Sequence, residues 1–193
     1  MKRTIIAAVI FASLGMAGAT FAAEEQATFA AGCFWCMQEL FERVPGVTHV
    51  VAGYAGGKDE HPTYQSVSTG NTGHSESIDL TFDPDKVSYE KLLEIFWKSH
   101  DPTNARGVAP DFGSEYRPII FYRNAEQKAV IEKAKVEAQK KYSKPIATEI
   151  VPFEKFYPAE DYHQDYVKKN SNDPYVQNVS LPRIRETGFG EAQ

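Results

Sequence analysis

Cysteine is scarce in this sequence, whose 193 residues include only Cys33 and Cys36, both in one short stretch. Such a pair cannot act as a stabilising framework, because a disulfide contributes little when the loop that it closes is short. Basic runs are no longer than Lys140-Lys141, and the formal charge is -5. These features argue against nucleic acid or an anionic membrane as the partner.

Long apolar runs are absent after residue 22, where no segment approaches the ~20 residues of a membrane-spanning helix. The first 22 residues are themselves typical of a secretory signal peptide, because Lys2 and Arg3 precede an apolar run that ends in a small-residue pattern at Thr20 and Ala22. We therefore expect export to the periplasm or out of the cell. A retained membrane anchor is the weaker interpretation.

The rest of the chain, residues 23–193, is predicted to be one domain, since about 170 residues suffice for a hydrophobic core. We place its core at about 26–170 and a tail at 171–193. Loss of Lys2 and Arg3 with the signal peptide would change the formal charge from -5 to -7. The mature chain is expected to be an acidic monomer with no membrane contact.

Apolar spacing predicts strands and helices in the order β-α-β-β-α-β, followed by further helices. This order indicates an α+β sandwich of ferredoxin-like kind with an irregular C-terminal tail. Residues 99–115 are predicted to be an active-site loop or a disordered segment. The expected strands cover 28–31, 47–52, 77–82, 119–122 and 148–151, and the expected helices follow Gly32, Ser88 and Asn124 and cover 64–67 and 159–169.

The stretch Gly32-Cys33-Phe34-Trp35-Cys36 lies where a predicted strand meets a predicted helix. Cys33 would sit at the positive end of the helix dipole, which favours a thiolate. Cys36 follows one turn later, within reach of a disulfide. The pair could therefore be a nucleophile with a resolving partner, a disulfide exchanger, a structural disulfide or part of a metal site. Haem attachment is excluded, because Met37 and not histidine follows Cys36.

Glu76 has the same parity as Ile78, Leu80 and Phe82 in the predicted strand, so its carboxyl would point toward the apolar face if the strand begins by residue 76. Burial would raise its pKa and keep it protonated, as a general acid requires. The alternative is an exposed glutamate at the end of the strand.

Three blocks of sequence together resemble the A-type peptide methionine sulfoxide reductases: Gly-Cys-Phe-Trp at 32–35, Thr63-Tyr64 with Gly70 to Glu76, and Asp111 to Arg117. The resemblance covers residues 28–169. It implies that Cys33 is the attacking thiol and that Glu76 protonates the sulfoxide oxygen. It also implies that Tyr64 and Tyr116 donate hydrogen bonds to that oxygen and that Asp111 helps to hold water or substrate in place. Phe34 and Trp35 would form a hydrophobic wall that receives the methyl group on sulfur.

The resemblance further implies reduction of the S epimer of methionine sulfoxide, protein-bound or free, through a Cys33 sulfenic acid. With two cysteines, any intramolecular disulfide must join Cys33 and Cys36, although most relatives have glycine at the second position and many carry resolving cysteines in the tail. An external dithiol such as a thioredoxin-like protein would then restore the thiols. No cofactor and no metal is expected.

Two other functions fit parts of the pattern. A thioredoxin-like disulfide oxidoreductase would share the cysteine pair at the helix start but would have no need of Glu76, Tyr64 and Tyr116. A periplasmic metal-binding protein could use Cys33, Cys36 and Met37 as ligands. The reductase accounts for more of the sequence than either alternative.

Overall fold

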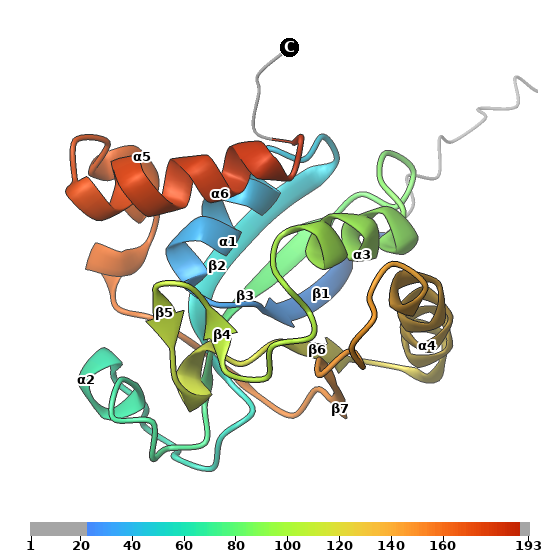
Figure 1. Ribbon diagram of the computed structural model, residues 1–193, viewed down its shortest axis with the longest axis horizontal. Coiled ribbons are helices and arrows are strands. Elements are labelled where there is room, and N and C mark those ends of the chain that lie inside the picture. The colour runs from blue at the N-terminus through green and yellow to red at the C-terminus, as the bar shows by residue number, and fades with distance from the viewer. Residues whose placement is uncertain (1–22, 190–193) are drawn as a thin grey trace, which may run out of the picture.

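The computed structural model describes residues 23–189, and the predicted signal peptide lies outside them. Its centre is a six-stranded sheet with the strand order β7-β6-β1-β3-β2-β8 (Figure 1). Neighbouring strands are antiparallel except for the parallel pair β6 and β7. The strands are β1 (Glu25–Ala30), β2 (Val47–Ala55), β3 (Ser75–Phe82), β6 (Ile119–Tyr122), β7 (Glu149–Pro152) and β8 (Phe156–Pro158).

The inner part of the sheet confirms the ferredoxin-like prediction. Strands β6, β1, β3 and β2 lie side by side, and the chain passes through them as β1-α1-β2-β3-α3-β6. Helices α1 (Phe34–Glu42) and α3 (Tyr89–Lys98) are the two crossover helices, and α4 (Ala125–Gln139) packs beside α3 and connects β6 to β7 (Figure 1). The chain is therefore an α+β sandwich that an additional helix and two edge strands extend.

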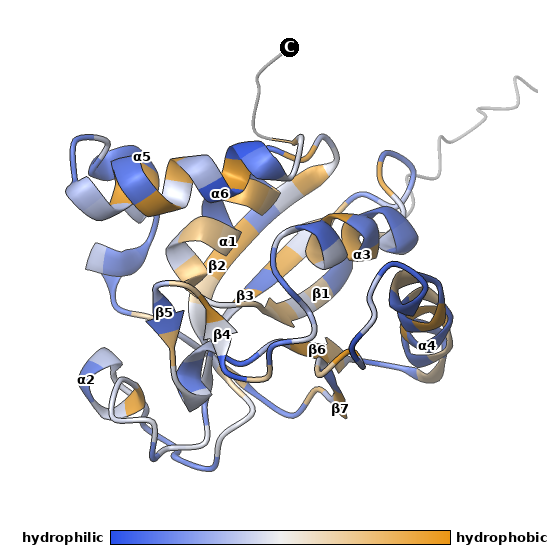
Figure 2. Ribbon diagram, viewed as in Figure 1, coloured by the Kyte–Doolittle hydropathy of each residue, from blue (hydrophilic) through white to orange (hydrophobic). Residues whose placement is uncertain are grey.

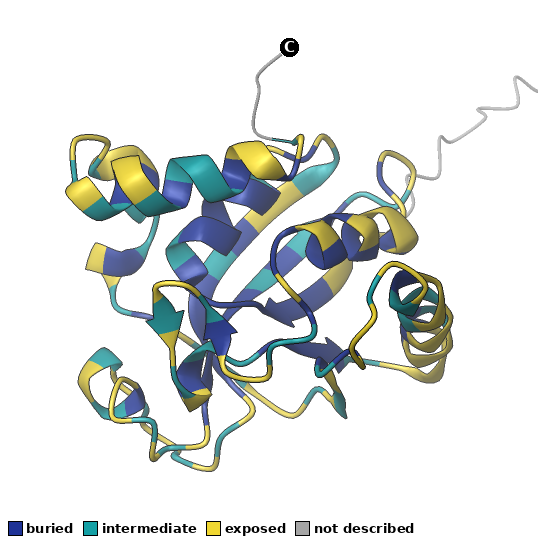
Figure 3. Cartoon of the chain, viewed as in Figure 1, coloured by how far each residue is buried: buried dark blue, intermediate teal, exposed yellow. Residues whose placement is uncertain are grey.

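One face of the sheet carries the main core, which the helices cover. The alternation of side chains along a strand sends Phe29, Ala52 and Leu80 to this face, where they are almost fully buried against α1 and α3. The opposite face carries a smaller cluster around Ile119 and Phe121. Orange segments of α1 and the strands meet in the interior (Figure 2), and the exposed residues of α4 and α6 (Leu181–Glu186) face outward (Figure 3).

Two predicted helix starts are confirmed by side-chain caps. The Ser88 hydroxyl accepts a hydrogen bond from the Lys91 N–H at 3.3 Å, and the Asn124 side chain accepts one from the Gln127 N–H at 2.7 Å. Each cap satisfies an N–H group that has no partner within its own helix. Within residues 23–189, none of the helices combines the length and apolarity that crossing a membrane requires.

The segment 99–115, predicted to be an active-site loop or disordered, is ordered. It contains the short hairpin of β4 (Gly107–Val108) and β5 (Asp111–Phe112), and a 3-10 turn over Ser114–Tyr116 follows. The helix predicted over 159–169 is interrupted: a 3-10 turn covers Asp161–His163, and α5 covers Tyr166–Lys169. Asp165 separates the two with a left-handed backbone, φ 54°.

The prediction of an irregular C-terminal tail is wrong. Residues Val176–Ser180 form a π-helical turn that continues directly into α6. Val176, Ser180 and Ile184 follow one another at intervals of four residues and are almost fully buried, and α6 packs against α1. Only two of these three residues are apolar, so the helical pattern was too weak to recognise in the sequence. Burial against α1 supplies the missing stabilisation.

Glycine at position 53 is required by the close approach of β2 and β8. A Cβ atom there would lie 2.3 Å from the backbone oxygen of Tyr157 and 2.4 Å from the Phe156 ring. We expect Gly53→Ala to lower the free energy of unfolding by about 1–3 kcal/mol, as overpacking does. Urea unfolding measures this, with the exposed His49→Ala on the same strand as control. Equal midpoints for both variants would contradict the assigned contact.

Candidate active site

The start of α1 presents Cys33. Gly32 precedes it with φ 72°, a left-handed conformation that suits glycine, and Cys33 occupies the N-cap position with no side-chain cap of its own. Cys33 is 5% exposed and Cys36 is 1% exposed, neither is in a disulfide, and the two thiols share a hydrogen bond. The sequence prediction that the two thiols lie together on one turn is therefore confirmed.

Glu76 points to the same helix start from the neighbouring strand. Its side chain is 3% exposed, and its Oε2 accepts a hydrogen bond from the Phe34 N–H at 3.0 Å. The predicted inward orientation is confirmed, because β3 begins at Ser75. Burial raises the pKa of Glu76 well above its ordinary value, and the Phe34 N–H offsets only part of this shift. Glu76 is therefore a protonated carboxylic acid beside the Cys33 thiol.

The resting charge of the cysteine pair differs from the sequence prediction of a readily ionised Cys33. Burial, the Cys36 side chain and the Glu76 carboxyl all raise the pKa of Cys33. The hydrogen bond from Cys33 lowers the pKa of Cys36 to about 7 despite its burial, and the Arg183 charge and the Ser180 hydroxyl lower it further. The helix start thus holds a Cys33 thiol next to a Cys36 that ionises near neutrality.

Tyr64 and Tyr116 come from two separate segments of the chain, and both lie near Glu76 and Cys33. Tyr64 begins α2 (Tyr64–Val67), and Tyr116 ends the 3-10 turn, where its carbonyl oxygen accepts a hydrogen bond from the Gly32 N–H at 3.2 Å. Burial raises the pKa of both phenols, and the nearby Glu76 and Cys33 raise it further. Both hydroxyls therefore stay protonated and can donate hydrogen bonds.

Asp111 is fixed in β5 by two partners from the C-terminal tail. Its Oδ2 accepts a hydrogen bond from the Tyr175 hydroxyl at 2.6 Å and lies 3.3 Å from the Arg183 guanidinium. Asp111 also acts electrostatically on Glu76 and Cys36. The structure therefore brings all eight residues predicted for the site to one region around the helix start: Cys33, Phe34, Trp35, Cys36, Tyr64, Glu76, Asp111 and Tyr116.

Phe34 and Trp35 form an aromatic wall, and they differ in exposure. Phe34 is 1% exposed and belongs to the main core, so it packs the core and also borders the site. Trp35 is half-buried and stacks on Tyr166 with 3.7 Å between ring centroids. The Tyr175 ring meets the Trp35 ring edge-on at 5.8 Å. Several aromatic rings thus surround the helix start.

His163 is the clearest site residue that sequence reasoning missed. Its Nδ1 accepts a hydrogen bond from Trp35 Nε1 at 3.0 Å, so the ring proton lies on Nε2, and burial lowers the pKa of the ring. Its centroid is 4.4 Å from that of Tyr64. The aromatic segment around residues 157–166 is the signal in the sequence that could have identified this neutral histidine.

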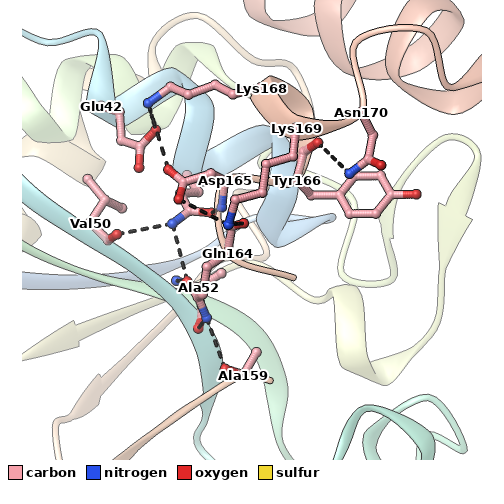
Figure 4. A network of polar contacts seen from close by, with 11 residues as sticks. Glu42, Val50, Ala52, Ala159, Gln164, Asp165, Tyr166, Lys168, Lys169 and Asn170 are labelled. Atoms are coloured by element: carbon pink, nitrogen blue, oxygen red, sulfur yellow. Dashed lines mark hydrogen bonds and ion pairs between the residues drawn. The ribbon is translucent and has the colours of Figure 1, made fainter. Parts of the chain in front are cut away.

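Gln164 attaches the His163 segment to the sheet (Figure 4). Its amide nitrogen donates to the carbonyl oxygens of Ala52 at 2.9 Å and Ala159 at 3.0 Å, and its amide oxygen accepts from the Ala52 N–H at 3.0 Å. Gln38 on α1 donates to the Val50 carbonyl and accepts from the Asp165 N–H. These bonds replace the missing helical turn and fix the position of His163 over Trp35.

We expect Glu76 to lower the free energy of unfolding as the pH rises from the acidic range, because burial raises the pKa of its carboxyl in the folded chain. In the unfolded chain the carboxyl ionises near pH 4.3, whereas the folded chain keeps it protonated. The folded state binds more protons over that interval, so stability falls as pH rises toward the folded-state pKa. Thermal unfolding from pH 4 to 8 should show this slope in the native chain and a shallower one in Glu76→Gln. Parallel curves would contradict the buried acid.

Met37, a ligand in the metal-binding alternative, is 3% exposed and packs in the main core. Among residues 23–189 no group of three or more His, Cys, Asp or Glu side chains is arranged to hold a metal ion.

Comparison with known proteins identifies the family of the chain. Residues 25–189 match the family model of peptide methionine sulfoxide reductase. The chain is 54% identical over 147 residues to the peptide methionine sulfoxide reductase MsrA of Listeria monocytogenes, which covers 75% of this chain and 83% of the relative. The MsrA of Sulfolobus acidocaldarius is 47% identical over 162 residues, or 84% and 92% of the two chains.

Solved structures give the same result. Reduced Mxr1 from Saccharomyces cerevisiae superposes with a TM-score of 0.74 at 31% identity, covering 78% of this chain and 87% of that one. Methionine sulfoxide reductase A of Corynebacterium diphtheriae superposes with a TM-score of 0.70 at 31% identity, covering 77% and 76%. Because the family model spans nearly all of the described residues and the relatives share about half of their residues with it, this chain belongs to the peptide methionine sulfoxide reductase family of oxidoreductases.

Proposed function

We propose that the chain reduces the S epimer of methionine sulfoxide, in oxidised proteins and as the free amino acid, with Cys33 as the nucleophile. One observation carries the proposal: the buried Glu76 carboxyl and the Cys33 thiol share one helix start, where the Phe34 N–H donates a hydrogen bond to the carboxyl at 3.0 Å. A thiol and an acid so placed can act on the sulfur and the oxygen of one sulfoxide group.

In the first step the Cys33 sulfur attacks the sulfoxide sulfur while Glu76 delivers a proton to the oxygen. The hydroxyl then passes from the methionine sulfur to the Cys33 sulfur while the new bond between the two sulfurs breaks with its electron pair on methionine. Methionine is thereby reduced by two electrons to the thioether, and Cys33 is oxidised to a sulfenic acid that keeps the oxygen. Cys36, with a pKa of about 7, is placed to take the proton that Cys33 gives up. Protonation of the oxygen means that no oxide ion has to leave.

The surrounding groups support binding in this proposal. The hydroxyls of Tyr64 and Tyr116 donate hydrogen bonds to the sulfoxide oxygen, Asp111 orders the polar side of the site, and Phe34 and Trp35 receive the methyl group on sulfur. Donors held in place before the reaction stabilise the charge that develops on the oxygen. The aromatic wall favours the methyl group, because its transfer from water to an apolar surface is favourable.

In the second step Cys36 displaces hydroxide from the Cys33 sulfenic acid and forms the Cys33–Cys36 disulfide, and a proton completes a water molecule. This protects Cys33 from irreversible oxidation. An external dithiol then reduces the disulfide. Mxr1 of Saccharomyces cerevisiae has been solved in complex with Trx2, superposing here with a TM-score of 0.54 at 25% identity. That complex supports a thioredoxin-like reductant for this chain.

Cys36→Ser is expected to complete one turnover and then recycle poorly. Cys33 and Glu76 remain, so one methionine per chain should form without reductant. With thioredoxin present, the steady-state rate should fall at least about tenfold, because the sulfenic acid must wait for an external thiol. Rapid-quench kinetics measures both phases. Undiminished recycling would refute the resolving role of Cys36.

We further propose that the chain acts on exported proteins in the periplasm, as a monomer, where it would repair oxidative damage. The N-terminal pattern of Lys2, Arg3 and the apolar run supports this. Cell fractionation and N-terminal sequencing of the mature chain test it, and an intact N-terminus in the cytoplasm would contradict it.

An assay with separated sulfoxide epimers and a dithiol tests the activity. Turnover of the S epimer alone is the expected result. Reduction of insulin without turnover of either epimer would favour the thioredoxin-like alternative instead.

A further inference from the structure

The C-terminal tail builds a polar environment around Cys36. The Cys36 thiol donates a hydrogen bond to Ser180 Oγ at 3.3 Å, and both residues are buried, at 1% and 0% exposed. Ser180 ends the π-helical turn, a distortion that directs it toward α1. A hydroxyl at this distance can donate to the sulfur in turn when the sulfur carries a negative charge.

Arg183 lies one turn after Ser180 and brings a buried positive charge. Its Nη2 donates to the Ala109 carbonyl at 2.9 Å and pairs with Asp111. Its Nη1 is buried and has no hydrogen-bond partner within residues 23–189. A Cβ atom on Gly32 would lie 3.4 Å from this Nη1, so the nitrogen sits over the backbone that leads into the cysteine pair.

The two cysteines therefore differ in their surroundings. Burial opposes ionisation of both sulfurs. The hydrogen bond from Cys33 lowers the pKa of Cys36 most, and the Arg183 charge and the Ser180 hydroxyl, which lies 3.3 Å from the sulfur, lower it as well. The Glu76 carboxyl raises the pKa of Cys33, and the Tyr175 hydroxyl offsets only part of that effect. In thiol–disulfide exchange the sulfur with the lower pKa is the better leaving group. Cys33 is also the more exposed of the two, at 5% against 1%. These differences make Cys33 the sulfur that a reductant can reach and Cys36 the sulfur that leaves when the disulfide is reduced.

We propose that the reducing dithiol attacks Cys33 in the Cys33–Cys36 disulfide, and that Cys36 leaves as a thiolate held by the Ser180 hydroxyl and the Arg183 guanidinium. The incoming thiolate forms a new S–S bond to Cys33, and the bond between Cys33 and Cys36 breaks with its electron pair on Cys36. The second thiol of the reductant then displaces the Cys33 thiolate, which takes up a proton. This inference rests on the proposed Cys33–Cys36 disulfide.

Ser180 and Arg183 also assist the formation of the Cys33–Cys36 disulfide. When Cys36 attacks the Cys33 sulfenic acid it must be a thiolate, and Ser180 and Arg183 stabilise that form. Ser180 contacts the leaving sulfur directly, and Arg183 acts on it through its charge.

Mapping the first mixed disulfide tests which sulfur is attacked. The full chain is oxidised with diamide, mixed with a thioredoxin whose second active-site cysteine is replaced by serine, quenched with acid at early times, alkylated and digested for mass spectrometry. We expect the thioredoxin on Cys33 and the alkyl label on Cys36. Thioredoxin on Cys36 with the label on Cys33 would overturn the proposal.

Variants in the tail test the role of the thiolate site. Arg183→Met and Ser180→Ala should slow the reduction of the diamide-formed disulfide by dithiothreitol about tenfold and about threefold, since a poorer leaving group slows exchange. Arg183→Lys, which keeps the charge, should stay within about twofold of the native rate, and the exposed Arg185→Met on the same helix should match it. Native rates in Arg183→Met would overturn the proposal.

Titration of Cys36 separates an electrostatic role from a merely structural one. In a Cys33→Ser background, absorbance at 240 nm reports the Cys36 thiolate, and Arg183→Met should shift its titration to higher pH while Arg183→Lys restores it. An unshifted titration would overturn the role of Arg183. Since diamide forms the disulfide here, failure of this inference leaves the sulfoxide reaction intact, and the methionine burst tests that reaction separately.

Discussion

Replacing Cys33 by serine is expected to abolish methionine formation. The hydroxyl oxygen of serine cannot accept the sulfoxide oxygen as a sulfenic acid does, so the two electrons have no donor. The remaining rate should be at least about 10³-fold below that of the native chain, as when an enzyme loses its nucleophile. The free methionine released from separated epimers, measured over time, gives this number.

The matched control is Cys36→Ser, which removes the other thiol of the pair one turn away. It should still release one methionine per chain, although more slowly because Cys36 no longer takes up the Cys33 proton, whereas Cys33→Ser should release none. The serine variant should also fold, because Cys33 makes no cap bond and a hydroxyl is close in size to a thiol. Comparable first turnovers in the two variants would mean that the assignment of the nucleophile is wrong.

Replacing Glu76 by glutamine is expected to lower kcat about 10²- to 10⁴-fold, the contribution of a general acid. Glutamine keeps the size of the side chain and an oxygen to accept the Phe34 N–H, but it has no acidic proton to give. The rate of the native chain should also fall as pH rises through the raised pKa of Glu76, and the variant should lack that fall. Stopped-flow kinetics of the first turnover measures both effects.

Glu39→Gln is the control for loss of a buried carboxyl. Glu39 is 5% exposed on α1, so it is buried to a similar extent as Glu76, but it pairs with Arg43 at 2.6 Å and takes no part in the site. Its variant should keep the native rate within about twofold. Full activity in Glu76→Gln would remove the carboxyl from the chemistry, and the higher thermal stability expected of that variant would show that it is folded.

The elements that carry strong local patterns could be predicted from the sequence. Alternation in β3 placed Glu76 inward, and the caps at Ser88 and Asn124 marked two helix starts, because these features depend on residues a few positions apart. The core order β-α-β-β-α-β followed from the same reasoning. Hence the positions of Cys33 at a helix start and of Glu76 on the neighbouring strand could be expected from the sequence.

The parts that could not be predicted depend on contacts between distant residues. His163 is 128 positions from Trp35, its hydrogen-bond partner, and Ser180 is 144 positions from Cys36. The interruption at Asp165 is stabilised by Gln38 and Gln164, which spacing alone cannot reveal. The resting charge of the cysteine pair was also wrongly predicted, since the helix dipole is a local effect and burial is not.

The central claim is that the oxygen of the substrate passes to Cys33 beside a protonated Glu76. The most direct test is to treat the Cys36→Ser variant with one equivalent of methionine S-sulfoxide in the absence of reductant and to measure the mass of the product. One added oxygen on the peptide containing Cys33, matched by one methionine released, is the predicted result. Methionine released while Cys33 stays an unmodified thiol would contradict the account.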